Sequence, residues 1–204
     1  TVILSSEHFH SLVREHLQRE KLRLFLELYF HKIRLISYLR PQVEMAVSHY
    51  STYLKTQGTD ELETYLKQCR PDNDYYNYNN YLSGWQKSFP NSSISVRLFD
   101  KEQLVNHEVV ADFCSLLGLE LPDRTKIQRV NESVTPTGQE LLKLVNKTFQ
   151  RFTEEGEENR TRIAFMQIIS TIYAGAGLKP DKELAVYIQG QFDDINEKVR
   201  KRWF

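Results

Sequence analysis

Cysteine is scarce in this sequence, and it has neither long hydrophobic runs nor an excess of charge of one sign. Only two cysteines occur in 204 residues, Cys69 and Cys114, which excludes a disulfide framework, and no Cys/His spacing suggests zinc. No apolar run approaches the ~20 residues that a membrane span needs. The 27 basic and 27 acidic residues balance, so any anion site is local. We predict no nucleic-acid partner and no membrane span.

The beginning of the chain also lacks two common features. The first residue is not methionine and no signal-peptide pattern follows; the chain opens directly with the strand-like run TVILSSEHF. We expect one domain over residues 1–204 that is truncated at its N-terminus. The missing signals and the scarce cysteine predict a cytoplasmic location.

Three short runs are predicted to form strands, at residues 2–5, 33–39 and 94–99, because they are apolar and rich in β-branched or aromatic residues. Elsewhere apolar residues recur every three or four positions, which indicates helices. The predicted helices cover residues 8–30, 41–55, 75–89, 103–117, 133–149, 161–173 and 180–203.

Strands that alternate with helices favour an α/β fold with a parallel sheet covered on both faces. In such sheets ligands bind beyond the carboxyl ends of the strands. Arg40 stands directly after the strand predicted at 33–39, and Pro41 then begins the next helix. We therefore expect Arg40 to lie at a ligand-binding edge.

Arg40, Glu44 and Ser48 are spaced at i, i+4 and i+8, which places them on one face if the helix includes all three. A guanidinium and a hydroxyl together suit a phosphate, because one supplies a charged fork and the other a neutral donor. A simpler interpretation stays open. Arg40 pairs with Glu44 in that case, and Ser48 is a small residue at a helix contact.

The segment YLRPQVEMAVSHY resembles the 3′-phosphate-binding segment of sulfotransferases that use PAPS (3′-phosphoadenosine 5′-phosphosulfate). In that family a strand ends in an arginine and a serine follows eight residues later, as Arg40 and Ser48 do. Other segments are similar to bacterial sulfotransferase-like proteins, often associated with surface polysaccharides: SISVRLFDKEQLVNHEVVADFCSLLGL, RVNESVTPTGQELLKLVN and DDINEKVRKRWF.

This resemblance implies a three-layer fold like that of the P-loop nucleotide hydrolases, with a short parallel sheet and many helices. It also implies an enzyme that transfers a sulfuryl group from PAPS to a hydroxyl acceptor, expected to be a carbohydrate. PAPS is then the co-substrate, and the reaction requires no metal.

The same resemblance assigns residues that follow the first predicted strand. Glu7 is the expected catalytic base, because a carboxylate can accept the proton of the acceptor hydroxyl. His8 is its rival, since imidazole titrates nearer pH 7. Ser5 and Ser6 are assigned to the donor site, although Ser5 occupies the position of a lysine in the cytosolic enzymes. Glu7 has an alternative interpretation as an acidic residue in a helix first turn.

Further residues complete the implied nucleotide site. Phe99 follows the third predicted strand, where related proteins place an aromatic residue near the adenine; it can equally be a core residue. Asn131 and Ser133 stand where the family often contacts the base or the 3′-phosphate. Tyrosines of the run DNDYYNYNNY, with Tyr50 and Tyr53, can line an acceptor groove or simply pack with their hydroxyls at the surface.

The loop that holds the 5′-phosphosulfate in this family is rich in glycine, serine and threonine and precedes the segment VILSSE. These 204 residues contain no such loop, since AGAGLKP follows a helix. Two other functions therefore stay open. One is a non-catalytic interaction domain with the same fold. The other is a glycosyltransferase, whose Asp-x-Asp metal motif is matched here only by Asp72 and Asp74, in a turn beside Pro71.

Overall fold

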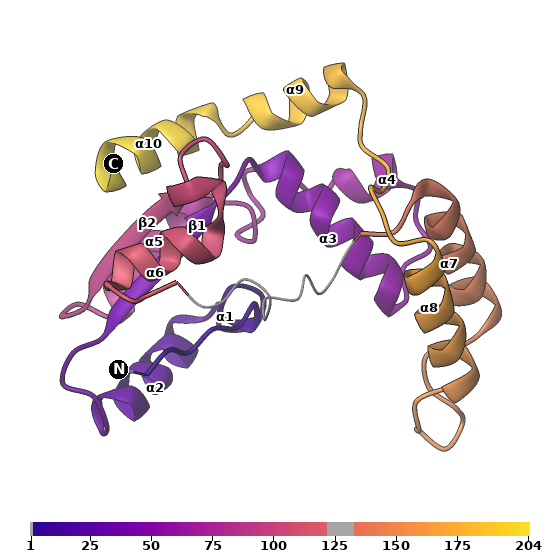
Figure 1. Cartoon of the computed structure of the whole chain (residues 1–204), viewed down its shortest axis with the longest axis horizontal. Coiled ribbons are helices and arrows are strands. Elements are labelled where there is room, and N and C mark those ends of the chain that lie inside the picture. Colours follow the sequence, from indigo (N-terminus) through magenta and orange to yellow (C-terminus); the bar gives the residue numbers. More distant parts are fainter. Residues whose placement is uncertain (1, 122–132) are drawn as a thin grey trace. The chain divides into compact units, whose positions relative to one another are not determined.

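The computed structural model describes residues 2–121 and 133–204 (Figure 1). Contacts between residues divide the chain into two compact units, which we call the strand unit and the helical unit. The strand unit comprises Thr1–Arg40, Arg70–Gly118 and Gln189–Phe204, and the helical unit comprises Pro41–Cys69 and Leu119–Ile188.

The strand unit is built on a pair of parallel strands. β1 (Arg34–Leu39) pairs with β2 (Ser93–Leu98) in register, from Arg34 opposite Ser93 to Leu39 opposite Leu98. Its helical elements are α1 (His8–Ser11), α2 (His16–Glu27), α5 (Tyr78–Ser88), the 3-10 turn η1 (Val105–His107), α6 (Val109–Leu117) and α10 (Asp193–Trp203).

Helices contact both faces of this strand pair. Successive strand residues point to opposite faces, so Ser37 and Tyr38 reach different neighbours. Ser37 hydrogen-bonds to Tyr81 of α5, whereas the Tyr38 hydroxyl donates to Asp112 of α6 at 2.7 Å. The predicted parallel sheet with helices on both faces is therefore present in the strand unit.

The apolar core of this unit lies on the α5 side of the sheet. Leu26 of α2 packs with Trp85 and Phe89 of α5, and Leu35 and Ile94 from the two strands pack against the same group. Burial of these large side chains is the main driving force that holds α2 and α5 on the sheet.

A single buried carboxylate joins the other face of the sheet to α6. Asp112 accepts hydrogen bonds from the Tyr38 hydroxyl, from Nε of Arg97 at 3.0 Å and from the backbone N–H of Val105 at 3.3 Å, and Arg97 Nη2 makes a second, shorter contact. The hydrogen bonds from Arg97 hold the pKa of this carboxyl below its ordinary value. Burial raises the pKa of Tyr38, and its bond to Asp112 adds to that effect.

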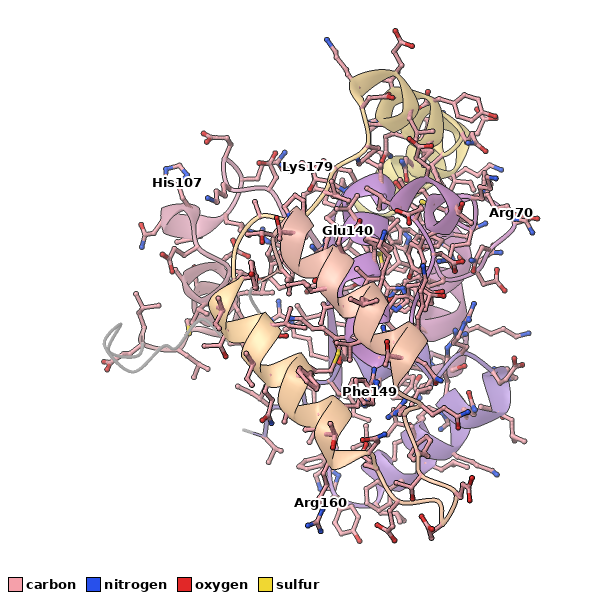
Figure 2. All side chains as sticks on the ribbon, turned by 90° about the vertical axis from the view of Figure 1, so that its right-hand side faces the viewer. Arg70, His107, Glu140, Phe149, Arg160 and Lys179 are labelled. Carbon is pink, nitrogen blue, oxygen red and sulfur yellow. The ribbon has the colours of Figure 1, made fainter. Side chains whose placement is uncertain are left out.

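The helical unit contains no strand in its described part. It consists of α3 (Gln42–Thr56), α4 (Leu62–Leu66), α7 (Pro136–Thr148) and α8 (Arg160–Ile172). α3 packs against α4 and α7, and α7 packs against α8. Figure 2 shows α7 and α8 side by side, with Phe149 and Arg160 at the two ends of the connection between them. A further helix, α9 (Lys182–Gly190), follows.

Two strand predictions are confirmed to within one residue, and the third is wrong. Residues 2–5 form no strand, and the side chains of Val2, Ile3 and Leu4 are 61%, 48% and 56% exposed. A run of apolar residues becomes a strand only when a neighbouring backbone completes its hydrogen bonds, and the described chain offers none at this position. Ser5, Ser6, Glu7 and His8 therefore do not follow a strand.

The helix predictions differ mainly in where helices break. The predicted helix at 8–30 is two helices, because Glu15 starts α2 in a capping box with Gln18, whose side chain accepts from the Glu15 backbone N–H at 3.0 Å. The predicted helix at 180–203 is also two, and the buried Phe192 lies between them. The Thr-Pro start is confirmed, since Thr135 caps α7 and Pro136 is its first residue.

The coarse fold class is thus mixed α/β, with many helices and a short parallel sheet of two strands. No helix in residues 2–121 or 133–204 is both long enough and apolar enough to cross a membrane.

Replacing Asp112 with Asn should destabilise the strand unit by about 2–3 kcal/mol at pH 7, because it removes the carboxylate that Arg97 and Tyr38 share. The pKa of the Asp112 carboxyl is lower in the folded protein than in the unfolded chain, where it is about 3.9. Its contribution to the free energy of unfolding is therefore complete above about pH 4 and is lost as the pH falls through the folded-state pKa. Urea unfolding should show that the difference in free energy of unfolding between the wild type and Asp112→Asn becomes smaller below about pH 4. A gap that does not change with pH would contradict this role.

Candidate functional site

The carboxyl ends of β1 and β2 bring together two of the predicted site residues. Arg40 directly follows β1 and Phe99 directly follows β2. The backbone N–H of Phe99 donates to the Leu39 carbonyl at 2.6 Å, which extends the parallel pairing by one step. The Arg40 guanidinium carbon then lies 5.2 Å from the centroid of the Phe99 ring. The expected ligand-binding edge therefore has a cation over an aromatic ring.

The position of Arg40 is fixed through its backbone rather than its side chain. Its carbonyl accepts a hydrogen bond from the Tyr78 hydroxyl at 2.8 Å, and Tyr78 is the first residue of α5. The half-buried side chain can therefore reorient toward a ligand without breaking this anchor.

Tyr75, three residues before α5, joins this edge electrostatically. Burial raises the pKa of its phenol; the negative charge of Glu7 raises the pKa further, and the positive charges of Arg40 and Arg14 lower it. These charges act over a limited distance, so Glu7 and both arginines lie within electrostatic reach of the same phenol. The structure thus brings the predicted base and the predicted phosphate anchor into one neighbourhood.

Contacts made by α1 explain how Glu7 comes to this place. His10 of α1 has its Nε2 atom 2.8 Å from the Tyr75 carbonyl oxygen, and its ring meets the Tyr75 ring edge-on with centroids 4.5 Å apart. Phe9 meets Trp85 of α5 in a similar edge-on contact at 6.2 Å. Helix α1 is therefore attached to α5 and to the segment before it, and Glu7 lies at the start of α1.

Glu7 and His8 are both exposed. Glu7 is the N-cap residue directly before α1 rather than a residue of its first turn, and its side chain makes no capping hydrogen bond. His8 is the first residue of that helix, and its backbone N–H donates to Oγ of Ser6 at 3.1 Å. Ser5 is exposed beside it.

The predicted common face of Arg40, Glu44 and Ser48 is wrong. α3 begins at Gln42, and Pro41 before it has the extended backbone angles φ −51° and ψ 136°. Arg40 therefore belongs to the end of the strand, because the rigid ring of Pro41 and its extended conformation stop the helix from continuing backward. Ser48 lies on α3 in the helical unit and is exposed.

The remaining predicted nucleotide-site residues belong to the helical unit or fall outside the described residues. Ser133 belongs to the helical unit, where its hydroxyl lies 3.4 Å from that of Ser51 and its carbonyl accepts from the backbone N–H of Gly175 at 2.9 Å. Asn131 falls outside the described residues. Tyr50 and Tyr53 belong to a cluster with Tyr65 in the helical unit, with ring centroids 4.7–6.3 Å apart.

The described residues contain no group of three or more His, Cys, Asp or Glu side chains that could hold a metal. Asp72 and Asp74, which have the spacing of a metal motif, make other contacts. Asp72 pairs with Arg70 at 2.8 Å, and Asp74 accepts from the side chain of Asn80 at 2.9 Å.

The strand ends therefore carry Arg40 and Phe99, and the Tyr75 phenol lies within electrostatic reach of Arg40, Glu7 and Arg14. A guanidinium can bind a phosphate, and an aromatic ring can stack on a planar base. A carboxylate and a phenol beside them can accept or donate protons. This set of groups suits an anionic ligand that also carries an aromatic ring.

Arg14 was not predicted as part of this site, and Tyr75 and Tyr78 were predicted only as tyrosines of the run DNDYYNYNNY. No motif marks them, because they act through contacts across the fold. The one sequence signal was the density of tyrosines before α5, since aromatic side chains with a polar tip often line sites.

Comparisons with known proteins give one sequence relative and no fold neighbour. No family model matches the chain, and no solved structure matches it. The chain is 26% identical, over an alignment of 220 residues, to a protein of Archaeoglobus fulgidus described as uncharacterized. The match covers all of this chain and 54% of the relative, so the chain spans about half the length of that protein.

The proximity of Glu7 and Arg40 to Tyr75 can be tested by titration. Glu7→Gln should lower the pKa of the Tyr75 phenol and Arg40→Met should raise it, because each variant removes one charge near the phenol. Tyrosine ring signals in carbon NMR, assigned with Tyr75→Phe, would measure both shifts.

Glu63→Gln is the matched control, because Glu63 is an exposed acid of α4 in the helical unit. This variant should leave the Tyr75 titration unchanged. Equal titration curves for the wild type, Glu7→Gln and Arg40→Met would show that the two charges do not lie near Tyr75.

Proposed function

We propose that the protein binds PAPS at the carboxyl ends of β1 and β2 and transfers its sulfuryl group to a hydroxyl acceptor, of carbohydrate type. The observation that carries the proposal is the placement of the Arg40 guanidinium over the Phe99 ring at this edge. In α/β sheets the carboxyl ends of parallel strands are where nucleotide ligands bind.

The chemistry of PAPS matches the groups at this edge. Its 3′-phosphate is a dianion that a guanidinium binds through two parallel hydrogen bonds, which suits Arg40. Its adenine is a planar ring that can stack on Phe99, whose side chain is 40% exposed and therefore accessible. The positive charge of Arg14 near the same neighbourhood adds attraction for a polyanionic ligand.

Glu7 is the proposed base in this scheme. The acceptor oxygen attacks the sulfur of PAPS, and the carboxylate of Glu7 takes the proton of that hydroxyl. The bond between sulfur and the 5′-phosphate oxygen breaks, and 3′-phosphoadenosine 5′-phosphate (PAP) leaves with the electron pair of that bond. The location of Glu7 within electrostatic reach of Tyr75, as Arg40 is, supports a base near the bound donor.

Several finer assignments belong to this proposal. They are the three-layer fold like that of the P-loop nucleotide hydrolases and the roles of Ser5, Ser6, Ser48, Asn131 and Ser133 in holding the donor, with His8 as the alternative base. A cytoplasmic location suits the two cysteines, which are both buried and free. The chain spans about half the length of its archaeal relative, so the sulfotransferase activity of the whole protein is likewise part of the proposal.

A second candidate is a non-catalytic interaction domain. It is favoured by an exposed apolar surface on and directly after α2, where large side chains are 56–76% exposed: Leu17, Leu24, Phe25, Leu28 and Tyr29. Contiguous apolar surface of this kind often marks a protein interface. The donor-binding test below separates the two functions.

Calorimetric titration with PAP tests the proposal, because PAP keeps the 3′-phosphate and the adenine. Arg40→Met should remove a charge-assisted contact worth about 1.5 to 3 kcal/mol, which is roughly a ten- to hundred-fold loss of affinity. Its backbone bond to Tyr78 is kept, so the fold should be retained, which circular dichroism would check.

Arg34→Met is the matched control, since Arg34 lies at the amino end of the same strand. It should bind PAP as the wild type does. Equal loss of PAP affinity in Arg40→Met and Arg34→Met would indicate a general charge effect rather than a binding site at Arg40. A folded protein that binds no PAP would remove the donor site and leave the interaction domain as the favoured function.

A further inference from the structure

The helical unit contains a cavity of about 210 Å³ beside α8 that is lined by an excess of positive charge. Lys55 at the end of α3, Arg162 of α8, and Arg151 from the connection between α7 and α8 contribute three cations. Glu158, from the same connection, contributes the one carboxylate among the lining residues. The lining therefore carries a net charge of +2.

Arg162 is the buried member of this group. It is 5% exposed, and its Nη2 atom donates to the carbonyls of Lys55 and Thr56 and to the side-chain oxygen of Asn146 at 2.8 Å. These bonds satisfy the last carbonyls of α3, where a cation is favourable. Its Nε atom, however, is buried and has no hydrogen-bond partner among the described residues.

A comparison with the other buried cation of this unit shows what Arg162 lacks. Lys143, whose side chain is 3% exposed, contacts Glu61 at 2.5 Å and Glu140 at 2.7 Å. Arg162 has no carboxylate within 4.0 Å among the described residues, although Glu158 is part of the same cavity. Glu158 instead lies 3.9 Å from Arg151.

A buried guanidinium without an anionic partner is unfavourable, because burial removes it from water without a compensating charge. Burial lowers the pKa of Arg162, and the neighbouring positive charge of Arg151 lowers it further, while Glu158 opposes both. The capping role accounts for Nη2 but leaves Nε without a hydrogen-bond partner among the described residues. An anion in the cavity would supply the missing partner.

We propose that this cavity binds a small oxyanion of the phosphate class, either inorganic phosphate or a phosphate monoester. The anion is the charge partner that the Arg162 guanidinium lacks among the described residues, and Arg151 and Lys55, which line the same cavity, supply further positive charge. A cavity of about 210 Å³ is large enough for a phosphate group with a short substituent. The site lies wholly within the helical unit and does not depend on the proposed donor site.

Proton–nitrogen NMR of the arginine Nε–H groups tests this directly, because each arginine gives its own signal. Inorganic phosphate, added at constant ionic strength against chloride, should shift the Arg162 signal saturably. Arg151→Met should raise the dissociation constant roughly ten-fold, as expected for loss of one charged contact. Arg151 is partly exposed, so this variant should keep its fold, and the spectrum itself reports that.

Arg160→Met is the matched control. Arg160 is an exposed arginine at the start of α8, and Figure 2 shows its side chain pointing away from the helices. The Arg160→Met variant should bind phosphate with the affinity of the wild type. Glycerol 3-phosphate, titrated in parallel, decides between the two sources: tighter binding than phosphate indicates a monoester, and weaker binding indicates the free ion.

Two results would overturn the proposal. One is the absence of a saturable shift at Arg162 in the folded wild type, which would leave Arg162 with its capping role alone. The other is a shift that is equally strong in Arg151→Met, which would show that the anion does not occupy the cavity.

Discussion

The buried carboxylate of Asp112 is the interaction on which the strand unit depends most. It receives hydrogen bonds from β1, from β2 and from the backbone before α6, so one side chain connects β1 to a segment more than 50 residues later in the sequence. Because Tyr38 and Arg97 face each other across the strand pair, the carboxylate also reinforces the register of the sheet.

The candidate site follows from that register. With Leu39 opposite Leu98, the next residue of each strand falls at the same edge, and this is why Arg40 meets Phe99. A slip by one residue would turn the side chains of one strand to the opposite face and separate the pair. The apolar packing of α5 on the other face then positions Tyr75 and, through His10, the start of α1.

The two units differ in the partners that stabilise their buried charged side chains. In the strand unit the buried charge is a carboxylate that has a guanidinium and a phenol as partners. In the helical unit the buried charges are cations. Lys143 has two carboxylates, whereas Arg162 has backbone carbonyls and an amide oxygen. An ion pair compensates desolvation more completely than a neutral acceptor does. This difference singles out the cavity at Arg162.

The sequence by itself determined the elements that have local causes. The β-branched runs at β1 and β2, the position of Arg40 after a strand, and the Thr135–Pro136 start of α7 were all predictable, because propensity and capping act over a few residues. Only the tertiary structure decided that residues 2–5 form no strand and that Arg40 lies over Phe99. It also decided that Nε of Arg162 is buried without a hydrogen-bond partner among the described residues. Each of these outcomes depends on groups far away along the chain, whose approach is set by packing rather than by local pattern.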